Sequence, residues 1–190
     1  KDQAIKWDPE KRLMLAERGG KKIDGFDLGN SPLSVTRELV NGKRLFMSTT
    51  NGTKSLKKVQ DVKYLFSMAL NNRKAVAERI ISLNQTHILI LGSGWEGSYS
   101  LEDSLAAGAL ASYLIENCKT GVSIINDELN AALALWEYWK ENILKCLKTA
   151  THGKRLTNIG DYEDDFNCCS QLDCLKIVPT QVEKGVIRAS

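Results

Sequence analysis

The feature that most constrains the fold is a unit that occurs three times along the chain. Each unit has a short apolar run, then a polar or glycine-rich turn, then the start of a helix. The three turns occupy residues 17–30, 49–53 and 92–103. Strands that alternate with helices predict an α/β fold with a largely parallel mixed sheet and flanking helices. In open α/β sheets, ligands collect at the carboxyl ends of strands, beside the N–H groups of helix N-termini, so these turns are the places to look for a site.

Apolar periodicity and capping signals divide the rest of the chain into expected elements. Strands are expected at 13–16, 44–48, 61–67 and 86–91, with a terminal hairpin around 177–178 and 186–187. Helices are expected at 31–39, 54–59, 73–82, 100–117 and 126–149, then a short helix after 152–155 and another starting within 161–166. At this length we expect one α/β unit over residues 1–190, with two lobes that share a cleft as the alternative.

Composition narrows the class of protein and of partner. The chain is 43% hydrophobic and 26% charged, with a net charge of +3 and scattered lysines. These values are typical of a soluble globular protein with no indication of nucleic-acid binding, and they suit a small anionic ligand. No apolar run approaches the roughly 18 residues that a membrane helix needs. Five cysteines without CxxC spacing favour reduced thiols in a cytoplasmic protein.

The turn at 17–30 begins with a carboxylate, a cation and two glycines, and carries a further carboxylate, Asp27, before Asn30. Three apolar residues within it (Ile23, Phe26 and Leu28) indicate that it packs against the protein. An ordered glycine-rich loop with paired charges suggests an anion or metal site. A surface turn with one Glu17–Arg18 ion pair explains the same stretch, and both interpretations remain open at this point.

The other two turns suggest phosphate and cation chemistry. The turn Thr49-Thr-Asn-Gly-Thr53 offers backbone N–H groups and hydroxyls to a phosphate, although a plain Asn-Gly turn is the alternative. Glu102 and Asp103 follow the helix cap Ser100, where carboxylates either complement the helix dipole or bind Mg²⁺. The segment Gly92-Ser-Gly-Trp-Glu-Gly97 matches GxGxxG, but its helix starts too late for a dinucleotide fingerprint. A Rossmann-type nucleotide-binding module is therefore the less favoured alternative.

Six groups of residues occur in one order along the chain: Ala16-Glu-Arg-Gly-Gly20, Gly25-Phe-Asp-Leu-Gly-Asn-Ser-Pro32, Thr49-Thr-Asn-Gly-Thr53, Ser100-Leu-Glu-Asp103 with Ala107-Gly108, Gly153-Lys-Arg-Leu156, and Glu163-Asp-Asp-Phe with Gln171-Leu-Asp173. Taken together, these segments resemble the 2-phosphosulfolactate phosphatase family of coenzyme M biosynthesis, over about residues 14–188. The resemblance implies an α/β phosphatase fold largely peculiar to the family. It also implies Mg²⁺-dependent hydrolysis of (R)-2-phospho-3-sulfolactate to sulfolactate and phosphate.

With that activity in mind, each candidate residue receives an expected role. Catalytic roles fall to Glu17, Arg18 and Asp27, and metal binding to Glu17, Asp27, Glu102 and Asp103. Substrate or phosphate binding falls to Gly19, Gly20, Asn30, Thr50, Asn51, Gly52 and Thr53. The expected cofactor is Mg²⁺, and the expected partner is a small anionic phosphate ester.

Some features differ from the family or leave alternatives open. The family has an N-terminal strand with an Asp-Val-Leu-Arg-type motif that this sequence lacks, and Gly92-Ser93-Gly94 replaces a more usual Cys-Ala-Gly. Without that strand we expect little activity. Another phosphorylated hydroxy acid is an alternative substrate. A non-catalytic dimerising scaffold built on Trp136 and Trp139 is a further hypothesis, and a homo-oligomer is an open expectation.

Overall fold

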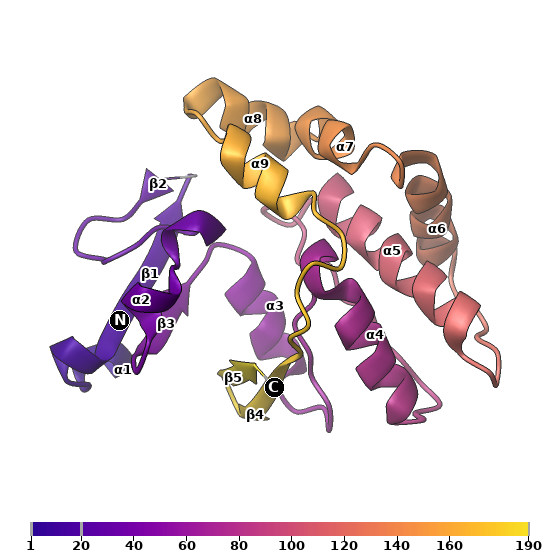
Figure 1. Ribbon diagram of the computed structural model, residues 1–190, viewed down its shortest axis with the longest axis horizontal. Helices are drawn as coiled ribbons and strands as arrows, with labels where there is room; N and C mark the ends of the chain where they lie inside the picture. Colours follow the sequence, from indigo (N-terminus) through magenta and orange to yellow (C-terminus); the bar gives the residue numbers. More distant parts are fainter. Residues whose placement is uncertain (1, 20, 190) are drawn as a thin grey trace.

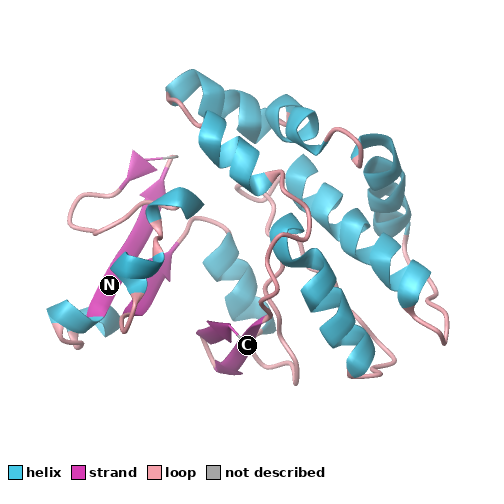
Figure 2. Ribbon diagram, viewed as in Figure 1, coloured by secondary structure: helices cyan, strands magenta, loops and turns pink. Residues whose placement is uncertain are grey.

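The computed structural model describes residues 2–19 and 21–189 (Figure 1). Its strands are β1 (Arg12–Arg18), β2 (Lys21–Lys22), β3 (Arg44–Ser48), β4 (Pro179–Glu183) and β5 (Val186–Ala189). Its helices are α1 (Asp2–Ile5), α2 (Arg37–Val40), α3 (Gly52–Val59), α4 (Arg73–Ser82), α5 (Leu101–Asn117), α6 (Asp127–Trp139), α7 (Ile143–Thr149), α8 (Thr151–Ile159) and α9 (Glu163–Cys169). Figure 2 shows the strands in two small groups beside a larger body of helices. None of the helices in the described residues is long and apolar enough to cross a membrane.

The main sheet has the order β2-β1-β3 and is mixed. Strands β1 and β3 run parallel, from Arg12 opposite Arg44 to Ala16 opposite Ser48, whereas β2 pairs antiparallel with the end of β1. Strands β4 and β5 form a separate antiparallel hairpin; the sequence predicts a hairpin here, but its first strand begins at Pro179, after the predicted 177–178. The α/β class is therefore consistent with the structure, but among the strands of the described residues only β1 and β3 pair in parallel, so a largely parallel sheet is shown only in part.

Two of the four strands predicted before the terminal hairpin are not strands in the structure. Residues 61–67 contribute one isolated bridge, between Phe66 and Thr180, and residues 86–91 join no ladder. An apolar, β-branched run favours an extended backbone, but a strand also needs a neighbour to receive its hydrogen bonds. Here the two segments instead line an apolar groove of about 520 Å³, where Leu89 is 77% exposed.

The helix predictions succeed where local signals dominate. Residues 73–82 form α4 as predicted, and α5 begins with the predicted cap, in which Ser100 Oγ accepts a hydrogen bond from Asp103 N–H at 3.3 Å. The prediction of one helix at 31–39 is wrong: a 3-10 turn (Pro32–Ser34) precedes α2. Ser31 Oγ makes a 2.5 Å hydrogen bond to Asp165 Oδ1 and caps nothing, so the α-helix starts only after Thr36.

The predicted helix at 126–149 is two helices, α6 and α7. The chain turns between them, where Asn142 N–H donates to Trp139 O at 2.8 Å. The short helix expected after 152–155 begins earlier, because α8 starts at Thr151 and contains those residues. Helix α9 matches the expected start within 161–166.

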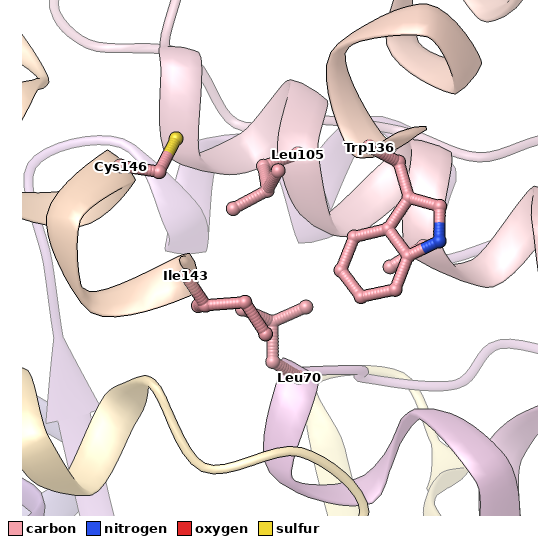
Figure 3. Close-up of a cluster of buried hydrophobic side chains, with 6 residues drawn as sticks. Leu70, Leu105, Trp136, Ile143 and Cys146 are labelled. Carbon is pink, nitrogen blue, oxygen red and sulfur yellow. The ribbon is translucent and has the colours of Figure 1, made fainter. Parts of the chain in front are cut away.

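The principal core lies among the helices, around Leu105 of α5 (Figure 3). Its buried members are Leu70, Leu105, Ala109, Trp136, Ile143 and Cys146. Helices α5 and α6 approach closely at Gly108, where an added Cβ would lie 2.0 Å from Ala132 O. Trp136 is 4% exposed in this core and is therefore not available to a partner surface, which removes the main residue of the scaffold hypothesis.

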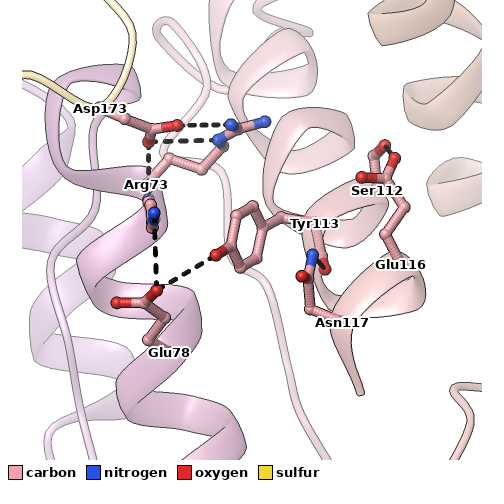
Figure 4. Close-up of polar contacts among 8 residues, drawn as sticks. Arg73, Glu78, Ser112, Tyr113, Glu116, Asn117 and Asp173 are labelled. Carbon is pink, nitrogen blue, oxygen red and sulfur yellow. Dashed lines mark hydrogen bonds and ion pairs between the residues drawn. The ribbon is translucent and has the colours of Figure 1, made fainter. Parts of the chain in front are cut away.

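A charged network fastens the C-terminal segment to the helices (Figure 4). Asp173 accepts from Arg73 Nη2 at 2.5 Å and from the Lys74 N–H at 2.7 Å, while the Arg73 guanidinium lies 5.3 Å from the Tyr113 ring. Tyr113 Oη donates to Glu78 Oε1 at 3.3 Å, and burial together with the negative charge of Glu78 raises the pKa of Tyr113. Asp173 thus has a structural role, because it holds the C-terminal segment against α4.

Candidate active site

A polar pocket of about 270 Å³ forms where the three predicted turns meet. Its residues come from β1, α3, α5 and α8, which Figure 1 labels, and from loops that include the turn after β3. Its lining residues are Glu17, Gly19, Asn30, Thr49, Thr50, Asn51, Gly52, Ser93, Gly94, Trp95, Glu96, Ser100, Glu102, Asp103, His152 and Arg155. The volume is slightly below the roughly 300–1,000 Å³ usual for ligand sites and suits a small ligand.

Parallel pairing explains why the first two turns meet. Because Ala16 of β1 lies opposite Ser48 of β3, the residues that follow both strands leave the sheet at the same edge. Glu17 comes from one strand end and Thr50 from the other, and Thr50 Oγ1 donates to Glu17 Oε1 at 3.2 Å. The carboxylate of Glu17 is thereby oriented at the pocket wall.

The turn at 49–53 is organised internally and leaves donors for a ligand. Thr49 Oγ1 accepts from the Thr53 N–H, and Thr49 O accepts from Thr53 Oγ1, both at 3.0 Å. Within the described part of the chain, no acceptor bonds the N–H groups of Thr50, Asn51 or Gly52. These groups stand at the amino end of α3, an arrangement that suits a phosphate.

The loop at 92–100 contributes to the pocket wall and is anchored by two hydrogen bonds near its middle. Asp103 Oδ2 accepts from the Gly94 N–H at 2.7 Å, and Asn51 Oδ1 accepts from the Glu96 N–H at 3.1 Å. The chain also makes a tight turn here, in which Trp95 and Ser98 bond to each other through both backbone groups. Gly94 thus contacts Asp103 and Glu96 contacts the 49–53 turn, which gives no support to the dinucleotide interpretation.

The structure brings most of the predicted site residues together. Lining the pocket are Glu17, Gly19, Asn30, Thr50, Asn51, Gly52, Glu102 and Asp103. Three others do not line it: Arg18 is exposed at the end of β1, Thr53 bonds back to Thr49, and Asp27 Oδ2 accepts from the Met14 N–H at 2.7 Å. Asp27 thus holds the returning loop against β1. Gly20 lies outside the described residues.

Among the lining residues that are absent from the predicted set, Arg155, His152 and Trp95 form one group. Arg155 and His152 lie three residues apart on α8, so they share one face of that helix. Trp95 comes from the 92–100 loop and packs against both, with ring centroids 6.0 Å from His152 and the Arg155 guanidinium 5.7 Å away. The sequence signal was the His152-Gly-Lys-Arg155 run, whose place in the fold the sequence does not give.

The donor set fits a hard divalent cation bound through few protein ligands. Within the described residues no group of three or more His, Cys, Asp or Glu side chains could hold a metal by itself. Mg²⁺ usually takes only one or two carboxylates and completes its octahedron with water and phosphate oxygens. Glu17, Glu102 and Asp103 are oxygen donors of that kind, and all line the pocket.

Cysteine chemistry is disfavoured at this site. Cys146 is fully buried behind the pocket, and burial, with a smaller contribution from Glu102, raises the pKa of its thiol to about 11. A thiol of this kind stays protonated near neutral pH and is a poor nucleophile.

Comparisons with known proteins agree on one family. The family model described as 2-phosphosulpholactate phosphatase matches residues 1–184. A protein of Prochlorococcus marinus is 64% identical over 187 residues, covering 98% of this chain and 77% of the relative. A Synechococcus protein is 57% identical over 187 residues (98% and 77%), and a Nostoc protein is 48% identical over 184 residues (96% and 75%). Each of these relatives is named a probable 2-phosphosulfolactate phosphatase.

Proposed function

The chain belongs to the 2-phosphosulfolactate phosphatase family and so is a phosphatase of the phosphoric monoester hydrolase class; we propose that it hydrolyses (R)-2-phospho-3-sulfolactate with the help of Mg²⁺. The products are sulfolactate and inorganic phosphate. We also place the enzyme in the cytoplasm, a proposal supported by its five free cysteines.

One observation carries the proposal: the ends of β1 and β3, the 92–100 loop and the start of α5 converge on one pocket. Within the described residues, this pocket combines N–H donors that have no acceptor, at Thr50, Asn51 and Gly52, with the carboxylates of Glu17, Glu102 and Asp103. Phosphoryl transfer needs those two kinds of group, since its catalysis is mostly positioning and charge stabilisation.

In the proposed reaction the 50–52 N–H groups hold non-bridging phosphoryl oxygens. A water molecule attacks phosphorus, the bond from phosphorus to the ester oxygen breaks, and the alkoxide leaves with a proton from solvent or a pocket acid. Glu17, fixed by Thr50, and Asp103, fixed by the Gly94 N–H, are preorganised to hold the cation or to accept the proton of the attacking water.

Mg²⁺ would be held by carboxylates among Glu17, Glu102 and Asp103. When bound, it would neutralise phosphoryl charge and polarise the ester. The carboxylates are already anchored by Thr50 and Gly94, so binding needs little rearrangement of these two side chains.

The test is phosphate release from synthetic (R)-2-phospho-3-sulfolactate by the purified full-length protein, with Mg²⁺ and with excess EDTA. We expect Mg²⁺-dependent release that EDTA abolishes and added Mg²⁺ restores. Full activity in EDTA would refute the proposed dependence on Mg²⁺. If the enzyme releases phosphate from 2-phospholactate but none from (R)-2-phospho-3-sulfolactate, the proposed substrate is wrong.

A further inference from the structure

We propose that Arg155, with Trp95 and His152 beside it, binds the second acidic group of the substrate and makes the enzyme selective for phosphate esters that carry one. This inference rests on the proposed function, because it divides the same pocket into a phosphate end and an acid end. The residues named form the Arg155 cluster.

The first line of evidence is that Arg155 has charge and donors that the protein leaves unused. Across residues 2–19 and 21–189, no carboxylate lies within ion-pair distance of its guanidinium and no acceptor is bonded to it. Yet the side chain is partly buried and lines the pocket. A guanidinium has five N–H donors in a planar fork. Since no protein acceptor in the described residues uses them, these donors are free to bind an oxyanion that enters the pocket.

The second line of evidence is that the guanidinium is held in place. Its centre lies 5.7 Å from the Trp95 ring, within the range of a cation–π contact. On another side it meets the backbone of Gly19, where an added Cβ would lie 3.3 Å from Nη2. A side chain at Gly19 would have to displace it. Trp95 and Gly19 thus position the fork without using its hydrogen-bonding capacity.

The third line of evidence is that the cluster is incomplete without a ligand. Within the part of the chain that the structure describes, His152 Nδ1 is the buried side-chain polar atom without a hydrogen-bond partner. His152 lies three residues before Arg155 on α8, and its ring packs 6.0 Å from Trp95.

The two ends of the pocket also match the charges of the substrate. The phosphate end has backbone donors and carboxylates for a cation, while Arg155 is the positively charged side chain among the pocket-lining residues. The substrate ester carries a sulfonate and a carboxylate besides its phosphate. An arginine fork suits such oxyanions, and its contact with either would be charge-assisted.

The test compares four esters that differ only in the second acid: 2-phosphosulfolactate, 2-phospholactate (carboxylate alone), 2-phosphooxyethanesulfonate (sulfonate alone) and ethyl phosphate (neither). For Arg155→Gln we expect kcat/KM to fall roughly 10- to 150-fold on the acidic esters, the worth of a charge-assisted hydrogen bond. On ethyl phosphate we expect a fall below about threefold. The ester on which the fall is largest identifies whether the sulfonate or the carboxylate meets Arg155.

Two further variants distinguish the proposed role of Arg155 from a general effect of positive charge. Lys154→Gln removes the same charge one residue away, from an exposed side chain that does not line the pocket, and should change every ester by less than about twofold. Arg155→Lys keeps the charge and loses the fork, so it should recover only part of the loss. Equal falls on all four esters, or no fall on any, would overturn the inference.

A binding experiment makes the inference independent of turnover. Titration with sulfolactate should change tryptophan fluorescence, the signal should vanish in Trp95→Phe, and Arg155→Gln should weaken binding at least tenfold. If no ester is hydrolysed, the proposed function fails while this titration still decides the role of Arg155. Equal sulfolactate affinity in wild type and Arg155→Gln would refute the acid site.

Discussion

Two cavities of opposite character meet in this molecule and share Gly52, Ser93 and Asp103 in their walls. The polar pocket of about 270 Å³ is built from side chains that are fixed by specific hydrogen bonds. The apolar groove of about 520 Å³ is lined largely by hydrophobic side chains of α3, α4, α5 and the extended segments 62–68 and 87–91.

The difference shows two ways in which a fold uses the ends of strand-like segments. At the pocket, β1 and β3 are paired, so the residues after them are held in a defined relation and can be preorganised for chemistry. At the groove, the extended segment 87–91 pairs with no strand in the part of the chain that the structure describes, and Ile88, Leu89 and Leu91 remain exposed. Directional bonds therefore define the pocket, whereas apolar surface alone defines the groove.

The largest expected effect is the loss of activity on replacing the pocket carboxylate Glu17. Replacing Glu17→Gln removes a charge that either binds the cation or takes a proton, so kcat/KM should fall about 10²–10⁴-fold. Asp27→Asn is the control, since Asp27 bonds the Met14 N–H outside the pocket and should change activity less than about tenfold. Phosphate-release kinetics and a thermal melt measure both variants. Equal losses would mean that Asp27 belongs to the chemistry.

Within the groove, we expect a buried side chain at its base to contribute far more to the free energy of unfolding than an exposed side chain on its rim. Leu110 on α5 is 5% exposed, so Leu110→Ala should lower the free energy of unfolding by about 2–5 kcal/mol. Leu89→Ala on the exposed rim should cost less than about 0.5 kcal/mol. Urea denaturation gives both values. A large cost at Leu89 would show that the groove is closed in solution.

The loop that separates the cavities offers a finer comparison. Gly94 has φ +66°, and an added Cβ would lie 2.7 Å from Ser98 O; Gly97 has φ +84° with nothing within 4 Å. Both alanine variants bear the left-handed penalty of about 1–2 kcal/mol, but only Gly94→Ala also disturbs the anchor of Asp103. We expect a rise in KM for Gly94→Ala alone. The same KM in both variants would show that the hydrogen bond from Gly94 to Asp103 does not affect substrate binding.

The smallest expected effect is at the contact that docks this loop on the 49–53 turn. Asn51→Ala removes the acceptor for the Glu96 N–H and should cost about 0.5–1.5 kcal/mol of transition-state stabilisation, or up to roughly tenfold in kcat/KM. Asn158→Ala, on an exposed position of α8, serves as the control. An unchanged kcat/KM in Asn51→Ala would show that the loop is held by other contacts.

Local sequence signals predicted the parts of this protein that depend on near neighbours. The cap of α5 was predictable because Ser100 and Asp103 are three residues apart and meet in the first turn of any helix. That Glu17 and the 49–53 turn each follow a strand could also be predicted locally, but their convergence additionally required β1 and β3 to be neighbours. The cap prediction needed only local spacing.

Tertiary structure decided what depends on partners distant in sequence. Arg155 reaches the pocket because α8 packs beside the 92–100 loop, a placement that no local pattern encodes. Asp27 looked like a pocket residue, but the path of its loop gives its carboxylate to the Met14 N–H. Residues 86–91 have the composition of a strand, but pairing is a property of two segments. The sequence by itself therefore determined which residues could do the chemistry, and long-range packing determined which of them meet.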